Sequence, residues 1–152
     1  MYEQEIEKLQ QIIDDSSHIV FFGGAGVSTE SGIPDFRSAE GIYHRKLAEL
    51  EAAGKLSAVV TQNIDGLHQA AGSKTVYELH GSIHRNYCRK CGKFYDAAYV
   101  KQAEGVPRCA CGGMIKPDVV LYEEGLDSGV ISGAVQAISQ ADTLIIGGTS
   151  LV

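Results

Sequence analysis

The sequence predicts an α/β fold in which a parallel sheet carries helices on both faces and a small cysteine-rich module is inserted into the chain. Three observations support this fold class. Short apolar runs alternate with segments of helical periodicity along most of the chain. Glycines gather directly after the first apolar run, and all four cysteines lie within residues 88–111. With 44% hydrophobic and 21% charged residues among 152, we expect a packed globular core.

The individual elements follow from periodicity and from residues that begin or end helices. Ile6, Leu9 and Ile13 give the first helix an apolar side. Strands are expected at short apolar runs rich in β-formers. The predicted order is a helix at 3–16, a strand at 18–22, a helix at 45–53 ending near Gly54, a strand at 57–61, a short helix at 64–71 ending at Gly72, strands at 75–79 and 119–122, a helix capped by Asp127 with Ile131, Val135 and Ile138 on one face, and a strand at 143–146.

Composition narrows the classes of partner. The formal net charge of −6 argues against broad binding to nucleic acid or to a membrane surface, although a local basic patch remains compatible with it. The N-terminus is charged and lacks the apolar core of a signal peptide, and no stretch is long enough to cross a bilayer. We therefore expect a cytoplasmic protein without nucleic-acid or membrane partners. In a reducing compartment, four cysteines favour a metal site or catalysis over disulfides.

The cysteines form two close pairs. Cys88 and Cys91 are separated by two residues, and Cys109 and Cys111 by one. Four thiolates in two pairs suit one tetrahedral zinc ion, and a Gly112-Gly113 turn is expected to bring the second pair together. Four thiolates leave no open coordination position, so the predicted site is structural. Four buried or redox-active thiols are the alternative.

A glycine-rich turn follows the first strand. Gly23, Gly24 and Gly26 would let backbone N–H groups approach a pyrophosphate, which is typical of a Rossmann-like sheet. The usual third glycine is replaced by Thr29, and an ordinary tight turn would look similar. The continuation through residue 37 is not helix-like because of Pro34. Within it, an aromatic ring and a cation, Phe36 and Arg37, could meet a nucleotide.

Polar residues follow the second, third and last strands, at the edge where open α/β sheets bind ligands. Gln62, Asn63 and Asp65 could bind a ribose or a carboxamide, and Asn63 or Asp65 could instead cap the short helix. His80 stands at the end of the third strand and is a candidate general base, with a structural role or an active His84 as alternatives. Gly147-Gly148-Thr149-Ser150 could contact phosphate or ribose, or could simply end the last strand.

With these residues in place, the chain resembles the sirtuin family. The resemblance rests on GAGVSTESGIPDFR at 24–37, TQNIDGLH at 61–68, ELHGS at 78–82, the paired cysteines, KPDVVLYEE at 116–124 and GTSLV at 148–152, in family order over nearly the whole chain. It implies NAD-dependent removal of acyl groups from lysine in proteins or peptides, giving nicotinamide and O-acyl-ADP-ribose. One structural zinc ion is implied as well.

The resemblance also implies roles for individual residues. His80 matches the general base and Asn63 a position that sets the ribose and a water. The cofactor-binding positions are Gly24, Ala25, Gly26, Thr29, Asp35, Phe36, Arg37, Gln62, Asn63, Ile64, Asp65, His80, Gly148, Thr149 and Ser150. The substrate positions are Val120, Leu121 and Tyr122, and the metal positions are Cys88, Cys91, Cys109 and Cys111.

The sequence departs from the family in two places. Gly41-Ile42-Tyr43 runs almost directly into His44, where family members carry a few dozen further residues, and the chain stops after GTSLV. We therefore expect an incomplete Rossmann-like NAD-binding domain over 1–82 and 118–152, with a zinc module at 83–117. The chain as written is expected to bind NAD weakly and to deacylate poorly. A non-catalytic, zinc-stapled peptide-binding protein and a protein ADP-ribosyltransferase are the alternative functions.

Overall fold

The computed structural model describes residues 2–29 and 41–150, with the side chains of Ser28 and Thr29 left out. The helices are α1 (Glu3–Asp15), α2 (Gly26–Thr29), α3 (Ile42–Ala52), α4 (Leu67–Ala70), α5 (Ala97–Gln102) and α6 (Ser128–Ser139). The strands are β1 (Ile19–Gly23), β2 (Leu56–Thr61), β3 (Val76–Glu78), β4 (Gly81–Cys88), β5 (Phe94–Tyr95), β6 (Ile115–Val119) and β7 (Thr143–Gly147).

Four strands form the parallel sheet, in the order β3-β2-β1-β7. Counted along the chain this order is 3-2-1-4, the order of a Rossmann sheet, and the direction of progression reverses beside β1. Such a reversal opens a crevice at the carboxyl ends of the strands, and ligands of open α/β sheets bind there. The predicted α/β, Rossmann-like class is therefore confirmed.

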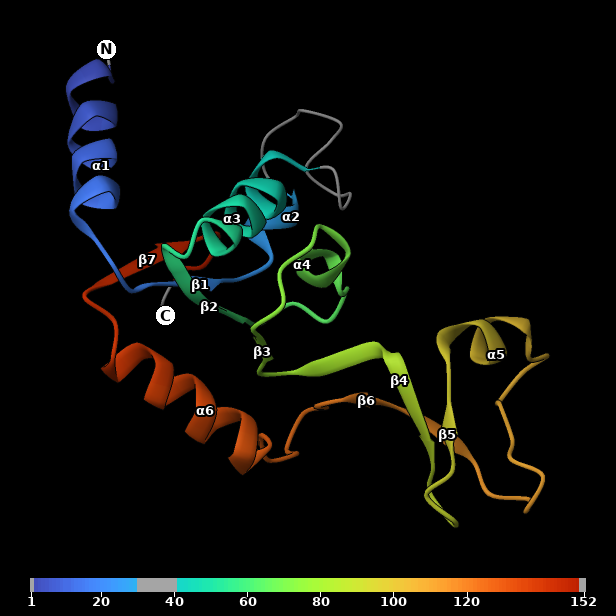
Figure 1. Cartoon of the computed structure of the whole chain (residues 1–152). Helices are drawn as coiled ribbons and strands as arrows, with labels where there is room; N and C mark the ends of the chain where they lie inside the picture. Colours follow the sequence, from blue (N-terminus) through green and yellow to red (C-terminus); the bar gives the residue numbers. More distant parts are fainter. Residues whose placement is uncertain (1, 30–40, 151–152) are drawn as a thin grey trace.

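Helices cover both faces of this sheet, as Figure 1 shows. On one face, Leu47 of α3 packs with Phe21 and Val59. On the other, Ala134 of α6 packs with Val20 and Val60. Because alternate residues of a strand point to opposite faces, the apolar runs of β1 and β2 supply both cores.

The remaining strands form a separate antiparallel sheet in the order β5-β4-β6. The strand predicted at 119–122 was wrong: the strand is β6, at 115–119, and it pairs with β4 rather than with the parallel sheet. An apolar run indicates a strand but does not choose its partner, and the partner here is a strand that the sequence analysis did not predict.

Three smaller expectations also need correction. α2 (Gly26–Thr29) adds a short helix at the start of the loop expected to be non-helical. The helix expected at 64–71 is limited to α4, whose N-cap is Gly66 rather than Asn63 or Asp65. Gly54 was expected as the C-cap of α3, but the C-cap is Ala53 and Gly54 follows it with a positive φ, as is usual for a glycine that ends a helix.

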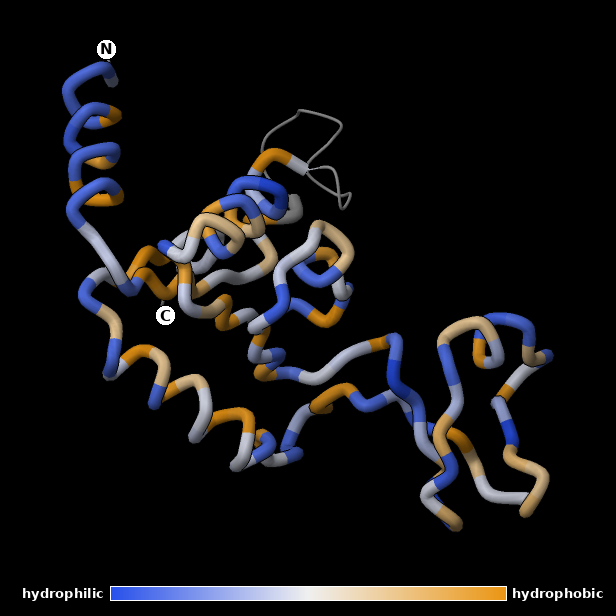
Figure 2. Tube along the Cα trace, viewed as in Figure 1, coloured by the Kyte–Doolittle hydropathy of each residue, from blue (hydrophilic) through white to orange (hydrophobic). Residues whose placement is uncertain are grey.

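The first helix projects away from the sheet, and of its three predicted apolar residues Ile13 packs against the core. Figure 2 shows α1 as largely hydrophilic, and Ile6 and Leu9 are exposed although their spacing predicted a packed side. Its C-terminal end is attached through Lys55, whose Nζ donates to the carbonyl oxygens of Asp14 (2.6 Å) and Ser16 (2.9 Å). A cation suits the negative end of a helix dipole, so this contact fixes the helix at one end only. None of the helices in the described residues combines the length and the apolar composition that a membrane span requires.

Candidate active site and metal centre

A cavity of about 430 Å³ lies at the carboxyl ends of β2 and β3, beside the loop that follows β1. Its lining consists of Ala25, Gln62, Asn63, Ile64, Asp65, His80, Val119 and Val120. The fold thus brings together residues that are far apart in the sequence. All of them except Val119 were predicted as site residues from the sequence. Val119 belongs to the same apolar run as Val120, and this run was the available signal for it.

The loops after β1 and β7 touch at the point where the strand order reverses. The N–H of Gly26 donates to the carbonyl of Gly148 at 2.8 Å. A Cβ added to Gly26 would lie 2.8 Å from Gly148 Cα, and one added to Gly24 would lie 2.8 Å from the Gly148 carbonyl oxygen. Only glycines allow this approach, so the loops form a backbone-lined cradle, of the kind that a pyrophosphate requires.

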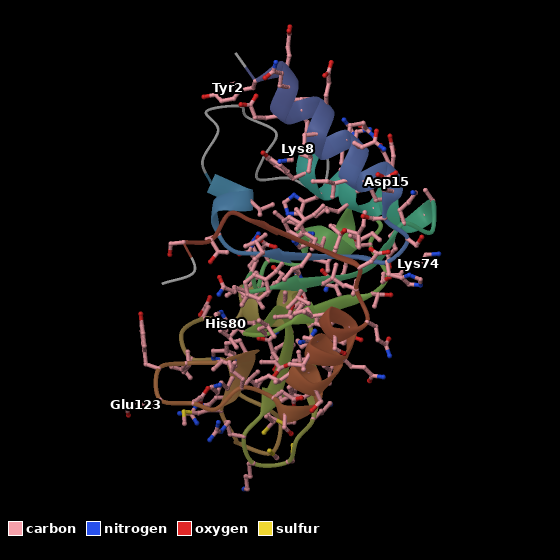
Figure 3. The ribbon with its side chains drawn as sticks, turned by 90° about the vertical axis from the view of Figure 1, so that its left-hand side faces the viewer. Tyr2, Lys8, Asp15, Lys74, His80 and Glu123 are labelled. Atoms are coloured by element: carbon pink, nitrogen blue, oxygen red, sulfur yellow. The ribbon has the colours of Figure 1, made fainter. Side chains whose placement is uncertain are left out.

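His80, labelled in Figure 3, is oriented by a backbone contact. Its Nδ1 lies 3.0 Å from the carbonyl oxygen of Gln62. A carbonyl can only accept, so Nδ1 carries the hydrogen, and in the neutral imidazole the lone pair is then on Nε2. The backbone carbonyl of His80 in turn accepts the N–H of Val120 at 3.0 Å. His80 is therefore held between two walls of the cavity with a basic nitrogen available.

The loop after β2 is ordered by its own polar groups. Asp65 Oδ1 accepts the N–H of Leu67 at 3.0 Å, and Thr61 Oγ1 accepts the N–H of Asn63 at 3.0 Å. His84 Nε2 lies 2.8 Å from the carbonyl oxygen of Asp65. Thus Asp65 lines the cavity and also supports the start of α4, while His84 is exposed and holds this loop rather than lining the cavity.

Other predicted site residues lie outside the cavity lining. Gly148, Thr149 and Ser150 follow β7, and Leu121 and Tyr122 follow β6 with 53% and 102% exposure. Thr29 is the last residue of α2, and its side chain is not described. Asp35, Phe36 and Arg37 lie outside the described residues.

Two histidines that the sequence analysis passed over lie buried beside the site. His44 of α3 and His68 of α4 are 0% and 1% exposed, with ring centroids 4.5 Å apart. Among the described residues, none of their ring nitrogens has a hydrogen-bond partner. Burial lowers the pKa of His44, and it lowers the pKa of His68 to about 4, with His44 as a second cause. Both imidazoles are therefore neutral in the folded chain.

This pair predicts acid sensitivity. Below the ordinary pKa of 6.5, unfolded His68 takes up a proton that folded His68, with a pKa of about 4, does not. Stability is then present above pH 6.5 and lost on acidification, by about 2 kcal/mol at pH 5 for this group alone. Urea unfolding followed by circular dichroism at about pH 7.5 and at pH 5 measures the loss. His68→Leu should show a smaller loss between the two pH values; an unchanged loss in this variant would contradict the assignment.

The four cysteine sulfurs form a compact cluster, all within 4.8 Å of one another. The Sγ atoms of Cys88 and Cys111 are 3.5 Å apart, and those of Cys91 and Cys109 are 3.6 Å apart. Tetrahedral zinc with Zn–S bonds of about 2.3 Å requires S···S separations of about 3.8 Å. The Tyr95 hydroxyl, 3.0 Å from the Cys109 sulfur, lowers the pKa of that thiol to about 6. The donor set therefore fits one structural zinc ion.

Together, the fold and the site define a Rossmann-like α/β protein with an inserted four-cysteine metal module and a histidine-bearing cavity at the carboxyl edge of the sheet. The model of the Sir2 family matches residues 24–47 and 42–152. The chain belongs to the Sir2 family.

Similar proteins include an NAD-dependent protein deacetylase of Clostridium perfringens, which is 52% identical and aligns with 99% of this chain and 80% of its own length. One from Cutibacterium acnes is 48% identical over 95% of this chain and 78% of its own length. Among solved structures, a Sir2 complex with a p53 peptide and NAD⁺ has a TM-score of 0.82 and 35% identity, covering 97% of this chain and 77% of that one.

An internal segment of the relatives has no counterpart here. The alignment with the C. perfringens protein spans 195 positions, whereas this chain has 152 residues, so at least 43 positions are occupied in the relative alone. The family model matches in two pieces that meet at residues 42–47, at the start of α3. Tyr43 and His44 are consecutive residues of that helix. The absence expected after Gly41-Ile42-Tyr43 is thus confirmed.

Proposed function

We propose that this chain is an NAD-dependent protein-lysine deacetylase that releases nicotinamide and O-acyl-ADP-ribose. The observation that carries the proposal is that His80, Asn63, Asp65 and Val120 line one and the same cavity in a member of the Sir2 family. Relatives named NAD-dependent protein deacetylases, and a Sir2 structure with NAD⁺ and a peptide, support the same activity.

The residues in and around the cavity have different proposed roles toward NAD. NAD supplies a ribose carbon that becomes electrophilic as nicotinamide leaves. The Gly24–Gly26 loop and the residues after β7 accommodate the phosphates, since backbone N–H groups can approach them there. Ile64, Asp65, Asn63 and Gln62 line the cavity, where Ile64 and Asp65 would face the nicotinamide of bound NAD and Asn63 and Gln62 its ribose. Nε2 of His80 removes a proton from a ribose hydroxyl, because its Nδ1–H is already committed to the Gln62 carbonyl.

The acyl-lysine peptide pairs with residues 120–122 as an added strand. Val120 lines the cavity, and its N–H bonds the carbonyl of His80, so a peptide at this segment would place its side chain close to the general base. The zinc ion holds the module that carries β6 and takes no part in the chemistry. We also propose the division into 1–82 with 118–152 and 83–117, and a cytoplasmic location.

Replacing His80 tests the catalytic assignment. With an acetyl-lysine peptide and NAD, His80→Gln should lower deacetylation by a factor of about 100 or more, because general-base catalysis is lost. Glutamine keeps a similar size and a hydrogen-bond donor. The measurement is peptide deacetylation by mass spectrometry at high enzyme concentration. His18→Gln is the matched control, because His18 directly precedes β1 and the cavity lies at the carboxyl ends of the strands. An equal loss of activity in both variants would contradict the role of His80.

The missing segment predicts a weak enzyme. At least 43 positions of the C. perfringens relative are absent here next to α3, so we expect the bound cofactor to be covered less completely and water to be excluded less well than in that relative. We expect NAD affinity, measured by calorimetry, to be lower than that of the C. perfringens protein by about tenfold or more, a loss of about 1.4 kcal/mol. Equal affinity and equal turnover would contradict this expectation. Peptide binding without any nicotinamide release would favour the non-catalytic alternative, and ADP-ribose attached to protein would favour the ADP-ribosyltransferase.

A further inference from the structure

Among residues 2–29 and 41–150, α5 covers one face of the small antiparallel sheet and no helix covers the other. On the covered face, Val100 of α5 and Tyr95 pack against Cys88, Cys109 and Ile115. Cross-strand partners share a face, so the register places Tyr87, Phe94 and Lys116 together on the opposite side. Met114 lies two residues before Lys116 along the chain and is the bridge partner of Arg108. We call the side formed by Tyr87, Arg89, Phe94, Arg108, Met114 and Lys116 the outer face.

The outer face combines apolar area with positive charge. Tyr87, Phe94 and Met114 are 39%, 51% and 53% exposed, and the rings of Tyr87 and Phe94 meet edge to face with centroids 5.7 Å apart. Arg89 and Arg108 are exposed as well, and the N–H of Arg89 donates to the Met114 carbonyl at 2.9 Å. Aromatic residues, Met and Arg are the types enriched at the centre of protein interfaces.

Charge is distributed unevenly along the chain. Residues 83–117 contain seven Lys and Arg against two Asp and Glu, whereas the rest of the chain contains six against seventeen. Four thiolates with one zinc ion would remove two of these positive charges, but the sulfurs lie on the covered face. In the described part of the chain, Glu124 lies beside the outer face, where its carboxylate already accepts from Lys116 at 2.9 Å. Within the described residues neither Arg89 nor Arg108 forms an ion pair, although Arg89 lies close enough to Glu124 to help lower the pKa of that carboxyl.

The outer face is continuous with the proposed peptide-binding segment. In the order β5-β4-β6, β6 is an edge strand of the small sheet, and the chain passes from it directly to Val120. A strand advances about 3.3 Å per residue, so an extended peptide that pairs with Val120 reaches the level of Lys116 about four residues further on. Residues that flank the acyl-lysine can therefore meet the outer face.

We propose that the outer face binds an acidic segment of the substrate protein next to the acyl-lysine, and thereby selects substrates with flanking Asp or Glu. This inference rests on the proposed deacetylase function. A short acidic segment fits better than a long polyanion, because the remainder of the chain is strongly acidic and would repel one. Phe94, Tyr87 and Met114 supply apolar contact between the arginines, which suits a segment that alternates acidic and apolar residues.

Binding of labelled peptides tests the proposal without requiring turnover. Two fluorescent acetyl-lysine peptides differ only in having Glu or Gln at the flanking positions, and fluorescence anisotropy gives their affinities for the zinc-loaded chain. The Glu peptide should bind about fivefold more tightly at low salt, and the difference should shrink at high salt. Equal affinity of the two peptides would overturn the proposal, whereas absent deacetylation with a preserved preference would count against the enzymatic function alone.

Matched variants locate the effect. Arg89→Glu and Arg108→Glu should each abolish most of the preference, whereas Lys101→Glu, the same change in net charge on α5, should retain it. Arg89 and Arg108 adjoin zinc ligands, so bound zinc is measured in every variant. Phe94→Ser changes the apolar part of the outer face and leaves the net charge unchanged. Equal losses of the preference for the Glu peptide in all charge variants would overturn the proposal. So would a single-stranded oligonucleotide that binds more tightly than the Glu peptide and depends on Arg89. A dimer in sedimentation that depends on Arg89 and excludes the peptide would overturn it as well.

Discussion

Replacing Gly81 by alanine should destabilise the protein by about 3 kcal/mol or more, because the new Cβ meets backbone rather than a movable side chain. Gly81 has a φ of +79°, and a Cβ built there would lie 1.8 Å from the Asp118 carbonyl oxygen. Gly81 and Val119 are paired residues of β4 and β6, immediately beside His80. The substitution would therefore separate the two strands at the wall of the cavity.

Gly54→Ala is the matched control for this experiment. Gly54 has a nearly equal φ of +73°, but nothing lies within 4 Å of an added Cβ. It should lose only about 1 kcal/mol, the cost of a left-handed conformation for alanine. Urea unfolding of the zinc-loaded proteins, followed by circular dichroism, measures both losses. Similar losses would show that backbone conformation, rather than the approach of β4 to β6, determines the need for glycine.

Removal of zinc should unfold residues 81–119 and leave the parallel sheet in place. The core of the small module consists mainly of Cys88, Cys109 and Ile115, too little apolar surface for an independent fold. Structural zinc contributes about 10–16 kcal/mol of binding free energy in small modules, so its loss is decisive. Hydrogen exchange by mass spectrometry, before and after chelation, should show lost protection in β4 and β6 and retained protection in β1 and β2.

Readdition of zinc should restore the protection, and Cys109→Ser should reproduce the effect of the chelator. Because β6 leads into Val120, peptide binding should fall with the module although no cysteine lines the cavity. Unchanged exchange in β4 and β6 after verified removal of the metal would mean that apolar packing suffices to hold the module.

Contacts between the two sheets explain why the pairing of β6 could not be read from sequence. Arg85 Nη1 donates to buried Glu78 at 2.6 Å, and its Nε donates to Asp118 at 2.9 Å. One guanidinium thus joins the end of β3 to β6. The apolar run VVLY at 119–122 would suit a strand in either sheet, so its pattern lacks this information.

The histidines also separate what the sequence pattern could predict from what it could not. The placement of His80 after an apolar strand, followed by glycine, marked it as a candidate base, and the structure places it in the cavity. Nothing in the sequence pattern distinguished the buried His44 and His68 from surface residues. Their burial arises because α3 and α4 pack together.

By itself, the sequence determined the α/β class, the four-cysteine module and the residues gathered at the carboxyl edge of the sheet, since periodicity, glycine placement and motif order are local properties. Only the tertiary structure decided that β6 pairs with β4 rather than with the parallel sheet, that His44 and His68 are buried together, and that no described segment covers one face of the small sheet. These features depend on which surfaces meet, and contacts between residues distant in the chain leave no periodic signal in it.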